Sequence, residues 1–159
     1  MVEPMTCTRC HAVNSGIALF CHSCGHPLRV NEEVECENHS GTTATGICIV
    51  CGKPVCDDCS LSREGKVYCD DVGHSQLMAT YTRLAFSPNE FEAEIIAKNL
   101  IPNGIPVLLF SAKLFSQFCR LTDERRISIF VSAGKSDEAK RLLLESELAE
   151  FLSDEHNSP

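Results

Sequence analysis

The chain has 159 residues, a formal charge of −8 at pH 7 and eleven cysteines, ten of which lie between Cys7 and Cys69. This acidic balance disfavours nucleic-acid binding, because phosphate binding requires a basic surface. The N-terminus has no basic region and no apolar run of signal-peptide length. We therefore expect a cytoplasmic protein without a membrane span, whose cysteines bind metal and do not form disulfides.

Two Cys-x-x-Cys pairs occur in residues 1–30: Cys7 with Cys10, and Cys21 with Cys24. Each pair turns the backbone so that two thiolates reach one ion, and two pairs complete a tetrahedron. Zinc is expected here; the same thiolates also bind iron in rubredoxin-like sites, but soft ligands in a closed tetrahedron favour zinc. Four thiolates leave no vacancy, so the neighbouring histidines are predicted not to be ligands: His11, His22 and His26.

Residues 1–30 resemble the short zinc ribbons that open many prokaryotic proteins. The resemblance rests on the two cysteine pairs, on Leu19 and Phe20 before the second pair, and on Gly25 after it. The chain departs from the pattern at His11, where a glycine is usual. The resemblance implies a small module that zinc stabilises.

Four more pairs of candidate ligands lie in residues 31–79: Cys36 with His39, Cys48 with Cys51, Cys56 with Cys59, and Cys69 with His74. These eight residues fill two tetrahedra, each with three thiolates and one imidazole. In a sequential arrangement the first two pairs bind one ion and the last two the other. In an interleaved cross-brace, the first and third pairs share one ion, and the second and fourth share the other. Ligand chemistry does not decide between the two arrangements.

This stretch resembles the B-box-type zinc fingers that precede other domains in bacterial proteins. The resemblance rests on residues 36–39, on the run 48–59 and on residues 67–69. It implies the cross-braced arrangement and a bacterial protein. The gap before the last histidine is longer than usual, which leaves Asp70 or Asp71 as an alternative eighth ligand.

Three cysteines within residues 51–59 could also belong to a redox dithiol. A reactive dithiol needs a Cys-x-x-Cys pair at a helix start within a βαβ unit, and the sequence predicts no such unit around residues 48–59. Zinc with four protein ligands has no open position for water or substrate. Three zinc ions are therefore expected to stabilise the structure and not to catalyse.

After a short joint expected at residues 75–79, the sequence predicts regular secondary structure in the order βαββα. Strands are predicted over residues 81–86, 105–110 and 126–131. The first helix is predicted to begin at a capping box, with Ser87 as N-cap and Glu90 as the third helical residue, and to end before Pro102. The second helix is predicted to run from Ser136 toward Leu152.

Residues 80–153 resemble a family of small prokaryotic signal-transducing domains, which are ferredoxin-like and related to the nitrogen regulatory PII proteins. The resemblance rests on residues 89–94, 103–107 and 127–131, followed by Glu138 and Ala139. It implies an α+β ferredoxin-like domain, although no fourth strand is predicted after the last helix. Residues 154–159 are predicted to be a disordered tail.

The connection at residues 111–125 is too long for a simple turn. Leu114, Phe115, Phe118 and Leu121 recur at helical spacing, which predicts a short amphipathic helix that covers either its own sheet or a partner. The PII resemblance implies a recognition element, whereas apolar helical stripes more often belong to a core. Cys119 is predicted to be a small buried apolar residue.

These features predict a non-enzymatic zinc-binding adaptor or regulator that acts through contacts with an unknown protein partner. A nucleic-acid-binding zinc-ribbon protein is an alternative that the acidic charge disfavours. A ubiquitin-ligase-like activity is a third possibility, which only the cross-brace suggests.

Overall fold

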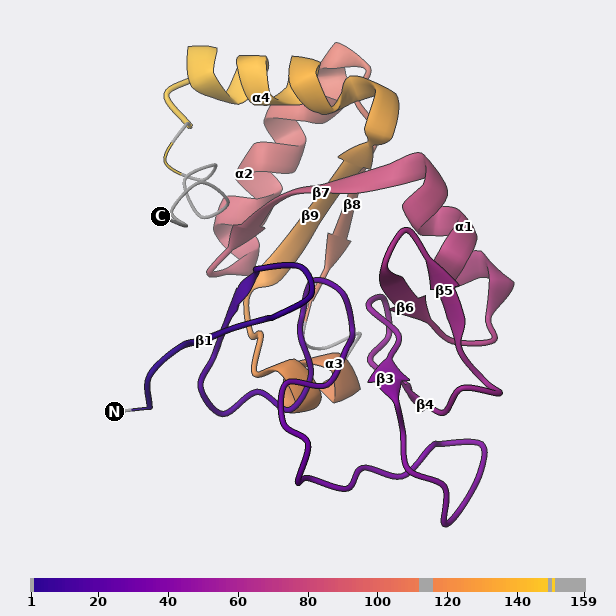
Figure 1. The fold of residues 1–159 in the computed structure, drawn as a ribbon. Coiled ribbons are helices and arrows are strands. Elements are labelled where there is room, and N and C mark those ends of the chain that lie inside the picture. Colours follow the sequence, from indigo (N-terminus) through magenta and orange to yellow (C-terminus); the bar gives the residue numbers. More distant parts are fainter. Residues whose placement is uncertain (1, 112–115, 149, 151–159) are drawn as a thin grey trace. The chain divides into compact units, whose positions relative to one another are not determined.

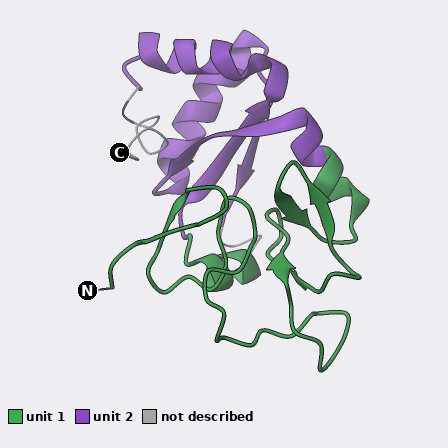
Figure 2. Cartoon of the chain, in the orientation of Figure 1, with its two compact units in different colours: residues 1–76, 115–124 green, residues 77–114, 125–159 purple. Residues whose placement is uncertain are grey.

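A computed structural model describes the chain apart from residues 1, 112–115, 149 and 151–159. The chain divides into two compact units (Figure 2). Unit 1 contains residues 1–76 and 115–124, and unit 2 contains residues 77–114 and 125–159. The predicted tail, residues 154–159, lies outside the described residues.

Unit 2 is a mixed α/β structure built on three antiparallel strands (Figure 1). The strands are β7 (Tyr81–Ser87), β8 (Val107–Phe110) and β9 (Ile127–Ser132), and their order in the sheet is β7-β9-β8. Two α-helices, α2 (Glu90–Leu100) and α4 (Ser136–Glu145), follow β7 and β9. Short 3-10 turns, η1 (Ile101–Asn103) and η2 (Ala133–Lys135), adjoin these helices.

The core of unit 2 lies between the sheet and its two helices. Alternate residues of β9 supply one side of it, because successive side chains of a strand point to opposite faces. Residues at helical spacing on α2 and α4 supply the other side. The members of this core include Ile127, Ile129 and Val131 from β9, Ala93, Ile96 and Leu100 from α2, and Ala139 and Leu143 from α4.

Two expected details of this part of the chain were wrong: the N-cap of the first helix and the end of the second. The N-cap of α2 is Asn89, whose side-chain oxygen accepts a hydrogen bond of 2.9 Å from the Glu92 backbone. Ser87 instead ends β7, where it pairs with Ile127. The boundary between the two units falls within the expected joint at residues 75–79, which is helical and belongs to α1 (Val72–Thr80). The helix α4 ends at Glu145.

Unit 1 contains very little regular structure. It has three small antiparallel hairpins: β1 (Met5–Thr6) with β2 (Val13–Asn14), β3 (Gly46–Ile47) with β4 (Pro54–Val55), and β5 (Leu61–Arg63) with β6 (Lys66–Tyr68). Two-stranded pieces of this size are not stable alone in water. Other interactions must therefore hold unit 1 together.

A helix from the β8–β9 connection completes unit 1. This helix, α3 (Ser116–Thr122), was predicted at residues 111–125, and its Phe118 and Leu121 are buried. They pack in an apolar cluster with residues of the cysteine-rich part of the chain and not in the core of unit 2. The expected contributions of Leu114 and Phe115 lie outside the described residues. Cys119 is half-buried.

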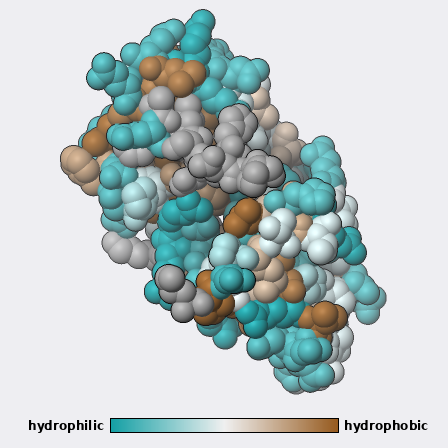
Figure 3. Space-filling view, turned by 60° about the vertical axis from the view of Figure 1, so that its left-hand side comes forward, coloured by the Kyte–Doolittle hydropathy of each residue, from teal (hydrophilic) through white to brown (hydrophobic). Residues whose placement is uncertain are grey.

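The surface is largely hydrophilic in the face that Figure 3 shows, with smaller hydrophobic areas between the polar ones. Among the described residues, no helix is both long enough and apolar enough to cross a membrane. The exposed apolar residues include Phe91 and Leu144, which are 73% and 60% exposed.

Candidate metal centres

The four cysteines of the N-terminal pairs converge on one point. Cys7 and Cys10 bracket the turn after β1, and Cys21 and Cys24 bracket the turn at residues 22–24. The Sγ atoms of Cys7 and Cys24 are 3.7 Å apart, and those of Cys10 and Cys21 are 3.5 Å apart. All four sulfur atoms lie within 4.8 Å of one another.

A second cluster joins Cys36 and His39 to Cys56 and Cys59. The Cys36 and Cys59 sulfur atoms are 3.8 Å apart. The imidazole of His39 faces them with Nδ1, which lies 3.4 Å from Cys56 Sγ and 3.2 Å from Cys59 Sγ. His39 itself is exposed. This cluster combines the first and third pairs of the sequence.

The third cluster joins Cys48 and Cys51 to Cys69 and His74. His74 lies in the first turns of α1, and its Nδ1 is 3.3 Å from Cys69 Sγ and 3.6 Å from Cys48 Sγ. The second and fourth pairs of the sequence therefore come together. The grouping in the structure is the interleaved one and not the sequential one.

The sulfur separations in the first two clusters fit a bound metal ion, and the ligand atoms of the third also lie within 4.8 Å of one another. A tetrahedron with Zn–S bonds of about 2.3 Å has edges of about 3.8 Å, close to the sulfur separations of 3.5–3.8 Å between neighbouring cysteines. A disulfide would require about 2.05 Å, and all eleven cysteines are free. The three sites, with four ligands each, are compatible with three metal ions.

Left-handed residues close the tight turns that follow three of the cysteine pairs. Gly25 and Gly52 have φ of 79° and 78°, and their backbone nitrogens donate to the carbonyls of Cys21 and Cys48 at 2.9 and 2.8 Å. His11 adopts the same conformation, with φ of 61°, and its nitrogen donates to Cys7 at 2.9 Å. Histidine is one of the few non-glycine residues that enter this region readily. The departure from the zinc-ribbon pattern at His11 therefore leaves the turn intact.

The neighbouring histidines do not belong to the first cluster. His22 Nδ1 lies 2.8 Å from Asn14 Oδ1, and the buried Asn14 also donates to Cys21 Sγ at 3.5 Å. His26 Nε2 lies 3.1 Å from the guanidinium of Arg9. Burial lowers the pKa of His26, and the positive charge of Arg9 lowers it further.

The two aspartates between Cys69 and His74 point away from the ligand positions of the third cluster. Asp70 forms an exposed ion pair with Lys53 at 3.0 Å and also accepts a hydrogen bond from Asn38. Asp71 Oδ2 lies 3.7 Å from His74 Nε2, on the side of the ring opposite the thiols. A carboxylate in that position favours the tautomer that leaves Nδ1 free to bind metal.

The thiols within a Cys-x-x-Cys pair differ in acidity. A hydrogen bond from the Cys24 thiol lowers the pKa of Cys21 to about 4. The matching hydrogen bond from Cys51 lowers the pKa of Cys48 to about 5. The pKa of Cys24 and that of Cys51 shift in the opposite direction. Each of these thiols donates the hydrogen bond and is buried, and both effects raise its pKa. A metal ion therefore meets one thiolate and one thiol in each of these pairs.

Sequence reasoning predicted the helix α3 but did not identify the surface that it covers. Phe118 and Leu121 of α3 share an apolar cluster with Phe20, Ala44 and Ile47. Two of these three residues directly precede a candidate ligand in the sequence. Helical spacing indicated that α3 would be amphipathic, but the sequence contains no signal for the surface that its apolar side covers.

Comparisons with family models, with curated proteins and with solved structures found no match to this chain.

Proposed function

We propose that this chain is a non-enzymatic zinc protein, in which three structural zinc ions fix a platform for contacts with another protein. The observation that carries the proposal is the presence of three separate groups of four candidate ligands, in each of which the ligand atoms lie within 4.8 Å of one another. Since protein atoms supply all four positions, no position remains for a substrate or a reactive water. Soft thiolate ligands with one or no imidazole favour zinc over harder cations.

The modules are proposed to be a zinc ribbon at residues 1–30 and a B-box-like cross-braced module at residues 31–79. The interleaved grouping of the second and third clusters supports the latter. The ferredoxin-like assignment for residues 80–153 draws support from the strand order β7-β9-β8 and from the helices that follow β7 and β9. An adaptor or regulatory role in a bacterial cytoplasm completes the proposal.

Elemental analysis of the purified full-length chain tests the metal content. We expect three zinc ions per chain, because the twelve ligands form three complete sets. Cys10→Ser, Cys59→Ser and Cys69→Ser each remove one ligand from a different set, and each variant should lose one ion. His11→Asn is the control, since asparagine tolerates the left-handed backbone and His11 belongs to no set. Wild-type protein with one ion or none, or iron in place of zinc, would contradict the proposal.

A further inference from the structure

The contacts of α3 concentrate on residues next to metal ligands. Its carboxyl end touches the first cluster: the Leu121 carbonyl accepts hydrogen bonds from the backbone of Leu19 at 2.9 Å and of Phe20 at 3.1 Å. Phe20 directly precedes the ligand Cys21. One residue beyond the end of the helix, the Asp123 carboxylate accepts a hydrogen bond of 2.6 Å from the Ser15 hydroxyl.

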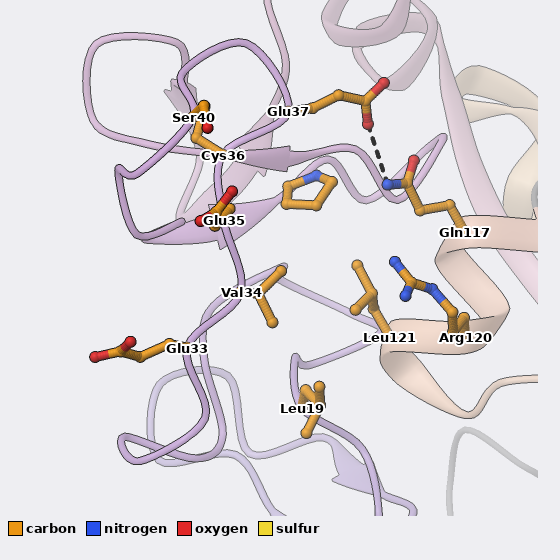
Figure 4. Close-up of a pocket in the computed structure, with 11 residues that line it drawn as sticks. Leu19, Glu33, Val34, Glu35, Cys36, Glu37, Ser40, Gln117, Arg120 and Leu121 are labelled. Carbon is orange, nitrogen blue, oxygen red and sulfur yellow. Dashed lines mark hydrogen bonds between the residues drawn. The ribbon is translucent and has the colours of Figure 1, made fainter.

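The second cluster contacts α3 through a polar side chain. Gln117 Nε2 donates a hydrogen bond of 3.1 Å to the carboxylate of Glu37, which follows the ligand Cys36 (Figure 4). A cavity of about 510 Å³ opens beside this contact, and its lining includes Val34, Arg120 and Leu121. The helix is therefore not enclosed on this side.

The third cluster contacts α3 at Gly52, the residue after the ligand Cys51. A methyl group added at Gly52 would lie 2.2 Å from the backbone nitrogen of Phe118, so glycine is needed for this close approach. Ile47, which precedes the ligand Cys48, is fully buried and packs in the same apolar cluster as Phe118. Each of the three clusters thus has a neighbouring residue that holds α3.

The helix is too short to be stable without the surface that it covers, and that surface depends on metal. A seven-residue helix is far below the roughly 12–15 residues that an isolated helix needs in water. Small metal-dependent modules unfold when the ion is removed, because metal binding supplies most of their folding free energy. Loss of metal would therefore remove the surface on which α3 folds.

We propose that α3 is a metal-dependent latch: the cysteine-rich residues 1–76 of unit 1 hold this helix while the three clusters are filled and release it when they are emptied. This inference rests on the proposed zinc binding. Release exposes Phe118 and Leu121 and leaves residues 116–122 without the surface on which they fold. Loss of metal from unit 1 would in this way change the structure of α3, a segment that lies in the sequence between two strands of unit 2, β8 and β9.

Hydrogen exchange with mass spectrometry on the full-length chain tests the latch, with elemental analysis of the same samples. In the zinc-loaded protein, peptides from residues 116–122 should be protected. After chelation these amides should exchange rapidly, while peptides from α2 and β9 stay protected. Unchanged protection of α3 in a sample that has lost its metal would overturn the latch alone. Absence of zinc from the untreated protein would overturn the proposed function as well.

A pair of glycine variants separates docking of α3 from general damage to unit 1. Gly52→Ala leaves all twelve candidate ligands in place but drives a methyl group against Phe118. Gly41→Ala is the matched control, because Gly41 has a similar φ of 76° and no atom within 4 Å of the added methyl group. We expect faster exchange of α3 by about tenfold or more only in Gly52→Ala, within the usual range of coupling between sites. Equal exchange in the two variants would overturn the latch.

Discussion

Hydrogen bonding between thiols places one proton within each of two cysteine pairs. Cys24 and Cys51 are held as thiols by their thiolate partners, Cys21 and Cys48. A metal ion binds the thiolate form, so loading must displace these protons. Zinc binding and proton release are therefore coupled in this chain.

The coupling predicts proton release when metal-free protein is loaded with zinc in weakly buffered solution. Cys21 and Cys48 have lowered pKa values and contribute almost no protons at pH 7, whereas their partners have raised pKa values and contribute theirs. As the pH falls, more ligands carry protons, so more protons should be released per ion and the apparent zinc affinity should fall. Calorimetry in buffers of different ionisation enthalpy measures the number of protons released per zinc ion bound. Zinc loading at pH 7 that released no protons would contradict the assignment.

Sequence patterns could select candidate ligands because ligand pairs need short and specific spacings. All twelve predicted residues occur in the three clusters. The last position was open among Asp70, Asp71 and His74, and spacing alone could not decide it. The choice depends on α1, which the sequence did not predict and whose first turns carry His74 to the thiols of the third cluster.

Among the helices, α2 offers a direct test of its N-terminal cap. Asn89→Ala removes the acceptor for the Glu92 amide, and we expect a loss of about 1 kcal/mol in the free energy of unfolding of unit 2. Asn89→Ser is the control, because serine also caps helices and should retain most of that stability. Chemical denaturation followed by circular dichroism measures both. Equal losses in the two variants would show that the cap is not the source of the effect.

The boundary of α2 shows how a local signal can be displaced by a neighbouring element. Ser87, Pro88 and Glu90 match the pattern of a helix start, so the sequence favoured Ser87 as the cap. In the structure Ser87 is fully buried and pairs with Ile127 at the end of β7. The strand thus extends into the predicted cap, and the next residue able to accept the hydrogen bond is Asn89. Strand pairing of this kind depends on residues forty positions away and is not visible in a local pattern.

At the scale of the whole molecule, the two units should differ in what stabilises them. Leu143→Ala removes a fully buried side chain from the core of unit 2 and should cost about 2–5 kcal/mol. The neighbouring Leu144 is 60% exposed, so Leu144→Ala is the control and should change stability by less than about 0.5 kcal/mol. Neither substitution should alter the zinc content. Thermal unfolding measures the stability of both variants, and elemental analysis measures their zinc content. Loss of zinc in Leu143→Ala would contradict the expectation that the two units are stabilised independently.

The sequence indicated the helical spacing of residues in α3 but not the unit to which the helix belongs. Phe118 and Leu121 could equally cover the sheet whose strands they connect. Which unit the helix joins depends on the shape of a surface made by Phe20, Ala44 and Ile47, residues that are far from α3 in the sequence. Such a surface exists only after the hairpins of unit 1 have formed around their ligand clusters.

Unit 1 is built from two separate stretches of the chain, residues 1–76 and 115–124, so its folding cannot be complete until the second stretch has been synthesised. All twelve candidate ligands leave the ribosome before residue 75, but α3 follows only about forty residues later. Because domains near the N-terminus usually fold first during translation, a nascent unit 1 could capture its ions while Phe20 and Ile47 still lacked their partner. The interval between ion capture and arrival of α3 is then a period in which an apolar surface of the growing chain is open to chaperones.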